Sequence, residues 1–595
     1  MRVKFVLVVF SLVWLALLVR IFYLSVESNA YYDALSNKNT IKRDLITPVR
    51  GNIFDRNGDP IAINKLGFKI VLKPHLSSKK NRETLENELR LLTQKFPHLN
   101  FEKMLKRYKK KDSYYNHQFI PVVDFIAYEE FLPLFSMFNL RENMQILPAS
   151  KRFYPHGKTA AHVIGYMSRA SRKDVKRDPL LKLIGYVGKS GIEKQYNAYL
   201  QGNPGERRIK VSAFNEEIEE ISHTAPDENH DMSLHLDMRL QKYIATLFKA
   251  KAGSVVVMGI DGEILAMGSY PEYDLNTFAM GISNSEWQKL INDVDAPFTN
   301  KTTNGLYPPG SVIKTGLGLI YISTKLHAWS QFNCTGSMEL GKRNFRCWKN
   351  RGHGTTNINK AIRESCDDYF YKGSLKVGIK EMSTGLHRYG LGQKTGIDIP
   401  NEFIGTVPSR TWKRKRYNQP WYKGETLNTS IGQGSFLVTP LQITQFTALM
   451  ASGKLPKPQV AHQVGEEEIA LVQKDILKPN EKKLLHHIQY AMKEVCNHPK
   501  GTATNYINSR VKIAGKTGTA QVIGISQETK KRLKEHEMAY YQRSHAWLST
   551  YAPIKNPKYV VTVLVEHGGH GGQAAGGIVS RIYDKLLEYG YLTKK

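Results

Sequence analysis

Cysteine is scarce in this chain, with four residues among 595, and an internal repeat or a low-complexity tract is absent. After residue 24 no segment approaches the roughly 18 apolar residues that cross a bilayer, which argues against a second membrane span. There is no zinc-finger array and no RNP motif, so no recognised nucleic-acid-binding element is present. A phosphate-binding loop is excluded as well. The Gly-Lys-Ser at 188–190 lacks the earlier glycine of GxxxxGK[ST], because that position is Leu183.

Acidic residues are few relative to basic ones. The chain has 53 Asp and Glu against 85 Lys and Arg, a formal net charge of +32. Such an excess indicates an anionic partner (nucleic acid, a phospholipid surface or an anionic polymer), unless the charge is simply spread over solvated surface. Two basic runs, at 107–112 and 530–534, lie far apart in the sequence. They therefore do not decide between an anionic partner and charge spread over solvated surface.

One long apolar run stands at the N-terminus, MRVKFVLVVFSLVWLALLVRIFYLSVE. Residues 5–24 contain a single charge, Arg20, and are long enough to cross a bilayer core of roughly 30 Å. Basic residues on the N-terminal side predict that residues 1–4 stay in the cytoplasm and that the rest is exported. The alternative is a signal peptide cleaved after the small residues at 28–30. We favour an uncleaved single-pass anchor.

The length predicts more than one domain. Short β-rich runs in 46–74 are separated by Asn-Gly and Asp-Pro turn signals, and helical periodicity follows. We therefore expect a long, mixed α/β domain over 25–230, with a helical head subdomain around 75–150. An acidic, turn-rich stretch at 214–230 predicts a linker before a second domain, residues 232–595.

The second domain begins with a hairpin signal, two apolar β runs around an Asp-Gly turn in 252–271. Long helical stretches follow, and two late β runs at 510–524 and 558–572 end the pattern. This order predicts an α+β fold in which helices pack on an antiparallel sheet.

A serine and a lysine three residues apart, Ser311 and Lys314, follow Pro-Pro-Gly and open an apolar run. We expect a helix to begin near Ser311, which would place the Lys314 amine beside the Ser311 hydroxyl on one helix face. A buried, neutral lysine can take the serine proton, and a helix N-terminus adds positive potential where an oxyanion forms. The pair alone is a weak signal, because it occurs by chance in most chains of this length.

Two further motifs strengthen it. Ser365-x-Asp367 follows 54 residues later, and Lys516-Thr517-Gly518 lies about 150 residues beyond that. This order and spacing resemble the penicilloyl serine transferases, and the resemblance extends to YPPGS, GQGSFLVTPLQ and SHAWLSTYAP. Upstream, RGNIFDRNG and GKSGIEKQYNAYLQG resemble the pedestal domain of class B penicillin-binding proteins. The chain is identified as a member of that class, in its elongation-type, penicillin-binding protein 2 subgroup.

The resemblance implies an elongated pedestal and a C-terminal penicillin-binding/β-lactamase-like transpeptidase domain with helices on both faces of its sheet. It implies that Ser311 attacks a stem-pentapeptide carbonyl, releases the terminal D-Ala and passes the acyl group to a neighbouring stem peptide. β-Lactams would mimic the first substrate. Lys314 would act as base, Ser365 as proton relay, Lys516 and Thr517 would orient the substrate carboxylate, and backbone N–H groups of Ser311 and Thr519 would form the oxyanion hole. The positions carried over as catalytic are Ser311, Lys314, Ser365, Asp367, Lys516, Thr517, Gly518 and Thr519.

The third residue of the middle motif departs from many relatives, which have Asn where Asp367 stands. A carboxylate can accept a hydrogen bond from Lys314, but it cannot donate one to a substrate amide unless it is protonated. Elongation-type relatives resemble this sequence in having Asp, so we interpret the change as a mark of the subgroup.

Three of the four cysteines, Cys334, Cys347 and Cys366, fall within residues 333–370. Export permits a disulfide, but an odd number cannot all pair locally. With His353 they complete a set of three thiolates and one imidazole, which suits a closed tetrahedral zinc site. A disulfide between two of them, or free thiols, are the alternatives. Some relatives have a zinc site in this stretch, so the resemblance supports one structural Zn²⁺ per chain, with no organic cofactor.

The resemblance also implies a place in the cell: the bacterial inner membrane, with the bulk of the chain in the periplasm. Its partners would be anionic peptidoglycan and its lipid-linked precursor, a membrane glycosyltransferase of the elongation machinery, and a scaffold protein bound by the pedestal; nucleic acid is not expected. The rival functions are a β-lactamase or D,D-carboxypeptidase, and an acylated β-lactam receptor. For the receptor, the four residues before the anchor would leave no room for a cytoplasmic effector.

Overall fold

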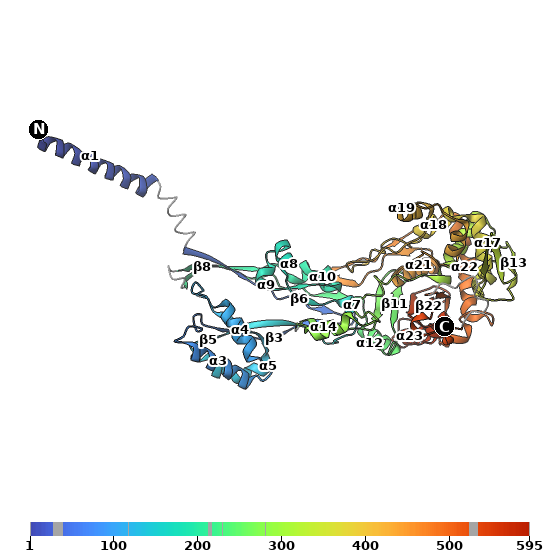
Figure 1. The fold of residues 1–595 in the computed structure, drawn as a ribbon, viewed down its shortest axis with the longest axis horizontal. Helices are drawn as coiled ribbons and strands as arrows, with labels where there is room; N and C mark the ends of the chain where they lie inside the picture. The colour runs from blue at the N-terminus through green and yellow to red at the C-terminus, as the bar shows by residue number, and fades with distance from the viewer. Residues whose placement is uncertain are drawn as a thin grey trace. The chain divides into compact units, whose positions relative to one another are not determined.

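The computed structural model describes residues 2–27, 40–116, 118–211, 217–228, 230–279, 281–522 and 534–593. Its first element is a long apolar helix, α1 (Arg2–Phe22), which continues as a π-helical turn, η1 (Tyr23–Glu27) (Figure 1). By length and composition Arg2–Glu27 could cross a membrane, and none of it is buried in the protein. The alternative cleavage site at 28–30, and residues 530–533 of the second basic run, lie outside the described residues.

The chain divides into two compact units, and the first contains the described residues of 1–51, 170–185 and 198–230. It is built on a three-stranded antiparallel sheet in the order β1-β8-β9. The prediction of a linker at 214–230 was wrong for much of its described part, because Glu217–Thr224 forms strand β9. Its acidic side chains pair across the sheet with Arg207 of β8. The strands are β1 (Ile41–Ile46), β8 (Gly205–Val211) and β9 (Glu217–Thr224).

The second unit contains residues 52–169, 186–197 and 231–595. Near its start, helices pack on strands around a buried apolar cluster. The predicted amphipathic helix is confirmed as α3 (Arg82–Lys95), whose leucines at 85, 89 and 92 are fully buried. The neighbouring elements are β3 (Pro60–Leu72), α4 (Phe101–Lys111), β4 (Ile120–Ala127) and β5 (Met144–Phe153).

The largest domain of this unit is built on a five-stranded antiparallel sheet in the order β12-β11-β23-β22-β21. The hairpin predicted in 252–271 is confirmed as β11 and β12. Strands β11, β12 and β23 are buried along their whole length, which explains why their sequences are almost continuously apolar. The strands are β11 (Gly253–Gly259), β12 (Ile264–Tyr270), β21 (Ala514–Ala520), β22 (His545–Ala552) and β23 (Tyr559–Val565).

Helices cover both faces of this sheet, as two consecutive residues of β22 show. Successive side chains of a strand point to opposite faces. The hydroxyl of Ser549 lies 2.7 Å from that of Thr447 on α21, whereas the hydroxyl of Thr550 lies 3.2 Å from that of Tyr583 on α23. The α+β class with helices on both faces is thus confirmed. The helices around the sheet include α12 (Met238–Leu247), α15 (Lys314–Thr324), α16 (Ile358–Arg363), α17 (Asp367–Val377), α18 (Ile379–Arg388), α19 (Arg410–Tyr417), α20 (Lys423–Ser430), α21 (Pro440–Ser452), α22 (Pro479–Asn497) and α23 (Gly571–Glu588).

Between α15 and α17 the chain forms a small lobe of two β-ribbons that lies outside the main sheet. In one ribbon β13 pairs with β16, and in the other β14 pairs with β15. Both ribbons contribute residues next to the middle catalytic motif. Their strands are β13 (Phe332–Cys334), β14 (Ser337–Leu340), β15 (Arg343–Arg346) and β16 (Gly354–Thr356).

A carboxyl group with limited access to water lies just after β12. Glu272 accepts a hydrogen bond at 2.8 Å from the backbone N–H of Ala160. Burial raises the pKa of Glu272 from 4.5 to about 7. The unfolded chain therefore loses this proton at a lower pH than the folded chain, so stability falls as the pH rises from about 4.5 to about 7.

We expect Glu272→Gln to remove this loss, because glutamine cannot ionise but keeps an oxygen for the Ala160 N–H. At pH 8 the variant should be more stable than the wild type by about 1–2 kcal/mol, and at pH 4.5 the two should coincide. Thermal unfolding followed by circular dichroism at both pH values measures the difference. The exposed Glu129→Gln is the matched control. A difference that did not depend on pH would contradict the assignment.

Candidate active site and metal centre

Ser311 lies in a 3₁₀ turn, Gly310–Ile313, and the α-helix begins three residues later than expected, at Lys314. The turn follows from Gly310, whose φ of 55° is incompatible with a right-handed α-helix. The Gly310 N–H donates to the Gly432 carbonyl at 2.9 Å. A Cβ on Gly310 would lie only 2.6 Å from the carbonyl oxygen of Thr519. Glycine is therefore required where this turn passes between β21 and the 432 loop.

The Lys314 side chain is fully buried and bound to the middle motif. Its Nζ donates to Asp367 Oδ1 at 2.7 Å, to the Ser365 carbonyl at 3.1 Å and to Ser365 Oγ at 3.4 Å. Within the described residues no hydrogen bond joins it to the Ser311 hydroxyl. Three hydrogen bonds therefore anchor Lys314 to residues 365–367, and the hydrogen bond that a carboxylate at position 367 can accept from Lys314 is present.

Ser365 occupies a strained position between α16 and α17. Its φ of 55° lies in the left-handed region, which costs a non-glycine residue of order 1 kcal/mol. The Cys366 N–H caps the preceding helix by donating to the Ala361 carbonyl at 2.9 Å. This left-handed residue turns the chain so that the Ser365 carbonyl and hydroxyl both reach Lys314.

The second lysine, Lys516 on β21, is also buried, and its Nζ donates to the Thr517 carbonyl at 3.0 Å. Burial, and next the charge of Lys314, hold the pKa of Lys516 well below its ordinary value. The Thr517 hydroxyl lies 2.7 Å from that of Thr502. The site therefore disfavours protonation of both lysines at once, which makes a neutral amine accessible inside it.

The strand β21 runs directly past the nucleophile turn. A Cβ on Gly310 would lie 3.2 Å from the Thr519 backbone nitrogen, and a Cβ on Gly518 would lie 2.6 Å from Val312 Cγ2. Backbone groups of Thr519 and of the Ser311 turn are thus neighbours, as an oxyanion hole requires. The structure brings together all eight positions that the resemblance carried over.

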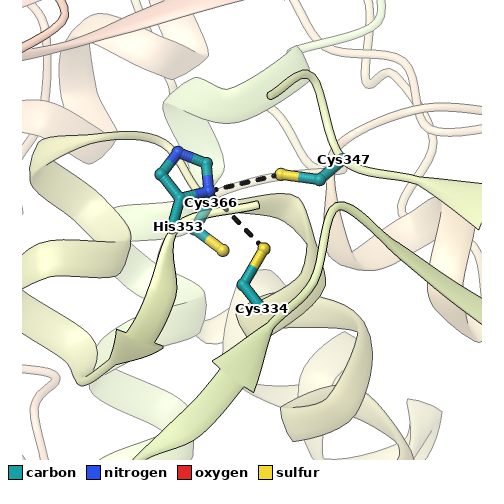
Figure 2. A group of neighbouring side chains, drawn as sticks. All are labelled: Cys334, Cys347, His353 and Cys366. Atoms are coloured by element: carbon teal, nitrogen blue, oxygen red, sulfur yellow. Dashed lines mark hydrogen bonds between the residues drawn. The ribbon is translucent and has the colours of Figure 1, made fainter. Parts of the chain in front are cut away.

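Cys334, Cys347, His353 and Cys366 also meet, all of them buried (Figure 2). One ligand atom from each lies within 4.8 Å of all the others. His353 Nδ1 is 3.6 Å from the sulfur of Cys334 and 3.5 Å from that of Cys347 (Figure 2). None of the four cysteines, all of which lie in the described residues, forms a disulfide. Three sulfurs and one imidazole nitrogen around one point fit the donor set of a closed tetrahedral zinc site.

The electrostatics of the cluster depend on whether a cation lies at its centre. Burial raises the pKa of the Cys334 thiol, and three adjacent thiolates would repel one another in a site withdrawn from water. A bound divalent ion would reverse this balance, because it stabilises thiolates and binds an imidazole nitrogen.

Comparison with known proteins agrees with this geometry. The penicillin-binding protein transpeptidase domain matches residues 253–588, and the penicillin-binding protein dimerisation domain matches residues 45–234. The chain is 32% identical to the peptidoglycan D,D-transpeptidase MrdA of Escherichia coli K12, over 96% of this chain and 91% of that one. A Helicobacter pylori penicillin-binding protein, PBP2, solved in complex with MreC, is 42% identical over 93% of this chain and 99% of its own, with a TM-score of 0.84. Pseudomonas aeruginosa PBP2 in complex with WCK 5153 is 28% identical over 93% and 98%, with a TM-score of 0.69.

The chain belongs to the penicillin-binding proteins of the PBP2 type. Its match to the H. pylori structure extends over 93% of its length. The family assignment therefore covers both the dimerisation domain and the transpeptidase domain of this chain. The fold and the family expected from the motifs are confirmed.

Sequence reasoning missed Trp348 of this penicillin-binding protein, which links the cysteine–histidine cluster to the middle motif. Its backbone N–H donates to Asp367 Oδ2 at 3.0 Å, and its indole N–H donates to the carbonyls of Glu364 and Ser365 at 3.0 and 3.1 Å. The available signal was its position next to Cys347. Gln433 was missed as well; its amide donates to the Thr519 carbonyl at 3.0 Å.

We expect Asp367→Ala to slow acylation by a labelled penicillin about 100-fold, because it leaves the buried Lys314 ammonium and the Trp348 N–H without their acceptor. Asp367→Asn should lose less, since its amide oxygen can still serve Lys314. Stopped-flow fluorescence measures the acylation rates.

Asp368→Asn is the matched control, because this neighbouring, buried carboxylate pairs with Lys372 and not with Lys314, and asparagine keeps an oxygen for Lys372. Its acylation rate should stay within about threefold of the wild type. Equal losses at positions 367 and 368 would show that the helix start, and not the Lys314 pairing, controls the rate.

Proposed function

We infer that Ser311 is the nucleophile by which this chain acts as a peptidoglycan D,D-transpeptidase. The activity is the one that its relatives of known function have, and the transpeptidase domain holds it here. One observation supports the role of Ser311 above all: the partly exposed serine lies on a rigid turn between a buried, ion-paired lysine and the Thr519 segment of β21.

In the first half of the reaction, Ser311 Oγ forms a bond to the carbonyl carbon of the penultimate D-Ala of a stem peptide. Lys314, acting as a neutral amine, takes the serine proton, which is the role that the family resemblance gives it. The N–H groups of Ser311 and Thr519 stabilise the developing oxyanion. Collapse breaks the amide C–N bond, and Ser365 relays the proton from Lys314 to the leaving D-Ala amine.

In the second half an amine from a neighbouring stem peptide attacks the acyl-enzyme. Its proton returns by the same route to Ser311 Oγ, and the new amide is the cross-link. Lys516 and Thr517 bind the carboxylate of the donor peptide, because an N–H donor and an O–H donor side by side suit a carboxylate. A β-lactam presents a similar carboxylate and a reactive amide, so it acylates the same serine.

A labelled penicillin should form one covalent adduct per chain in the wild type and none in Ser311→Ala, as detected by mass spectrometry of tryptic peptides. The adduct should persist for many minutes, because a transpeptidase site withholds water from the ester. Ser323→Ala, which changes another helix-borne serine of the same segment, is the matched control and should label normally. An adduct that survives Ser311→Ala would overturn the mechanism, and turnover within seconds would favour the rival β-lactamase or carboxypeptidase function.

We further propose that Cys334, Cys347, His353 and Cys366 hold one structural Zn²⁺. Protein donors fill a tetrahedral set, which leaves no position for a reactive water. The ion would supply bonds that tie the ribbon lobe to Cys366, the residue between Ser365 and Asp367. The serine nucleophile does not need metal chemistry, so the role of the ion is to fix the middle motif.

His353→Ala should reduce zinc from one per full-length chain to substoichiometric amounts, with an affinity at least roughly 100-fold lower. It should also lower the midpoint of thermal unfolding and slow penicillin acylation, because the loop that holds Ser365 and Asp367 loses its tether. Metal analysis, differential scanning calorimetry and acylation kinetics measure the three effects. The exposed His327→Ala is the control. A wild-type protein without zinc, or a variant with lower stability and normal acylation, would contradict this proposal.

We propose that the protein is anchored in the bacterial inner membrane by α1, with the transpeptidase domain in the periplasm, and that it serves cell elongation and rod shape. The long apolar helix supports the anchor. The H. pylori relative in complex with MreC supports a scaffold partner for the dimerisation domain. The glycosyltransferase partner is an expectation from the family resemblance.

A further inference from the structure

Two segments next to the active site are strongly basic. Residues 336–353 and 409–425 together hold eleven Lys and Arg against two acidic residues. The first contains the β14–β15 ribbon and the second contains α19, whose sequence is RTWKRKRY. Their exposed cations include Lys342, Arg343, Arg410, Arg414, Lys415 and Arg416. We call the exposed side chains of 336–353 and 409–425 the basic surface.

Intramolecular partners do not account for this charge. Lys413, the buried lysine of α19, is paired with Glu425 at 2.6 Å. Among the described residues, the six exposed cations named above take part in no ion pair. Unpaired charges of one sign on neighbouring elements repel one another and create a positive potential over the surface. A polyanion bound there would remove this repulsion.

The two segments are neighbours in space and not only in composition. The Lys413–Glu425 ion pair fixes α19 to the first turn of α20. A Cβ on Gly424 of α20 would lie 3.3 Å from Cζ of Phe345, in the β14–β15 ribbon. The Phe345 ring in turn lies 5.8 Å from that of Tyr371 on α17. The basic surface therefore continues from α19 across α20 to the ribbon.

The basic surface extends to the middle motif of the active site. The ribbon ends in Cys347 and Trp348, and the Trp348 indole donates to the carbonyl of Ser365. Helix α20 packs on α17, which begins at Asp367. A polymer that lay across the basic surface would therefore have its side branches within reach of the middle motif.

Aromatic rings are interspersed with these cations. Tyr417 is 53% exposed, Tyr422 is 59% exposed and Trp348 is 53% exposed. The Trp412 ring meets the Tyr417 ring edge to face at 5.5 Å. Exposed aromatic rings offer flat apolar faces on which pyranose rings pack, and Arg with Tyr is a combination typical of recognition surfaces.

We propose that the basic surface binds a peptidoglycan strand, with its cations on stem-peptide carboxylates and its aromatic rings on the sugars. This assignment rests on the transpeptidase function proposed above. A peptidoglycan strand carries many carboxylates along a sugar backbone. The carboxylates match the cations of the basic surface, and the sugars match its aromatic rings. A phospholipid headgroup matches only the charge. The surface holds the polymer by many weak contacts, and the active site then acts on its peptides.

The test is co-sedimentation of the full-length chain, in detergent, with purified sacculi at increasing salt. The variant Arg410→Gln/Arg414→Gln/Lys415→Gln/Arg416→Gln removes four charges from α19. We expect about tenfold weaker binding to sacculi and a shallower dependence on salt. A second variant, Lys342→Gln/Arg343→Gln, removes charge from the ribbon and should weaken binding in the same direction.

The matched control removes four exposed charges from another helix of the same unit, Lys103→Gln/Lys106→Gln/Lys109→Gln/Lys110→Gln on α4. It should bind sacculi like the wild type. Labelled penicillin should acylate all variants at the wild-type rate, because so small a substrate does not span the basic surface. The acylation assay separates the proposed function from the proposed binding surface. Failure of acylation at Ser311 would refute the proposed function. Normal acylation together with normal sacculus binding in both basic-surface variants would refute only the binding surface.

Two further comparisons identify the ligand. Sacculi whose carboxylates have been converted to amides should bind the wild type about as weakly as native sacculi bind the α19 variant. Binding to vesicles of phosphatidylglycerol should fall less in the α19 variant than binding to sacculi, because a headgroup matches only the charge of the basic surface and α1 inserts into lipid in both proteins. Undiminished binding to amidated sacculi, an equal loss in the α4 control, or a loss confined to the vesicles would each overturn the proposal.

Discussion

The ion pair between Lys314 and Asp367 is the contact on which the active site depends. The Lys314 ammonium is fully buried, and a buried charge is tolerated only when it is paired and hydrogen-bonded. Its acceptors come from one loop, Ser365 to Asp367, about 50 residues further along the chain. The cost of burying the charge therefore forces helix α15 and that loop together, and the nucleophile turn is carried with α15.

Backbone contacts fix the other side of the site. Gly310 and Gly432 approach so closely that a Cβ on Gly432 would lie 2.2 Å from the Gly310 carbonyl oxygen. Neither can be replaced by a larger residue without moving Ser311 away from β21. The strained Ser365 belongs to the same arrangement, because its left-handed φ is held by the lysine contacts and by the helix cap at Cys366.

The ribbon lobe acts on the catalytic motif through a few short links. Cys366 belongs both to the cysteine–histidine cluster and to the Ser365-x-Asp367 loop, and Trp348 follows directly on Cys347. The lobe also presents part of the basic surface. The contacts to the middle motif and the exposed cations are therefore parts of one continuous lobe.

Sequence alone determined the features that depend on local order. Leucines at helical spacing predicted α3, apolar runs around Asp-Gly predicted the β11–β12 hairpin, and three motifs in order predicted the family. Only the tertiary structure decided the rest. It put Ser311 in a 3₁₀ turn in place of the expected helix start, turned part of the expected linker into β9, and brought the Trp348 indole to the Ser365 carbonyl. These features depend on contacts between segments tens of residues apart, whose energies come from desolvation and close packing that no local pattern records.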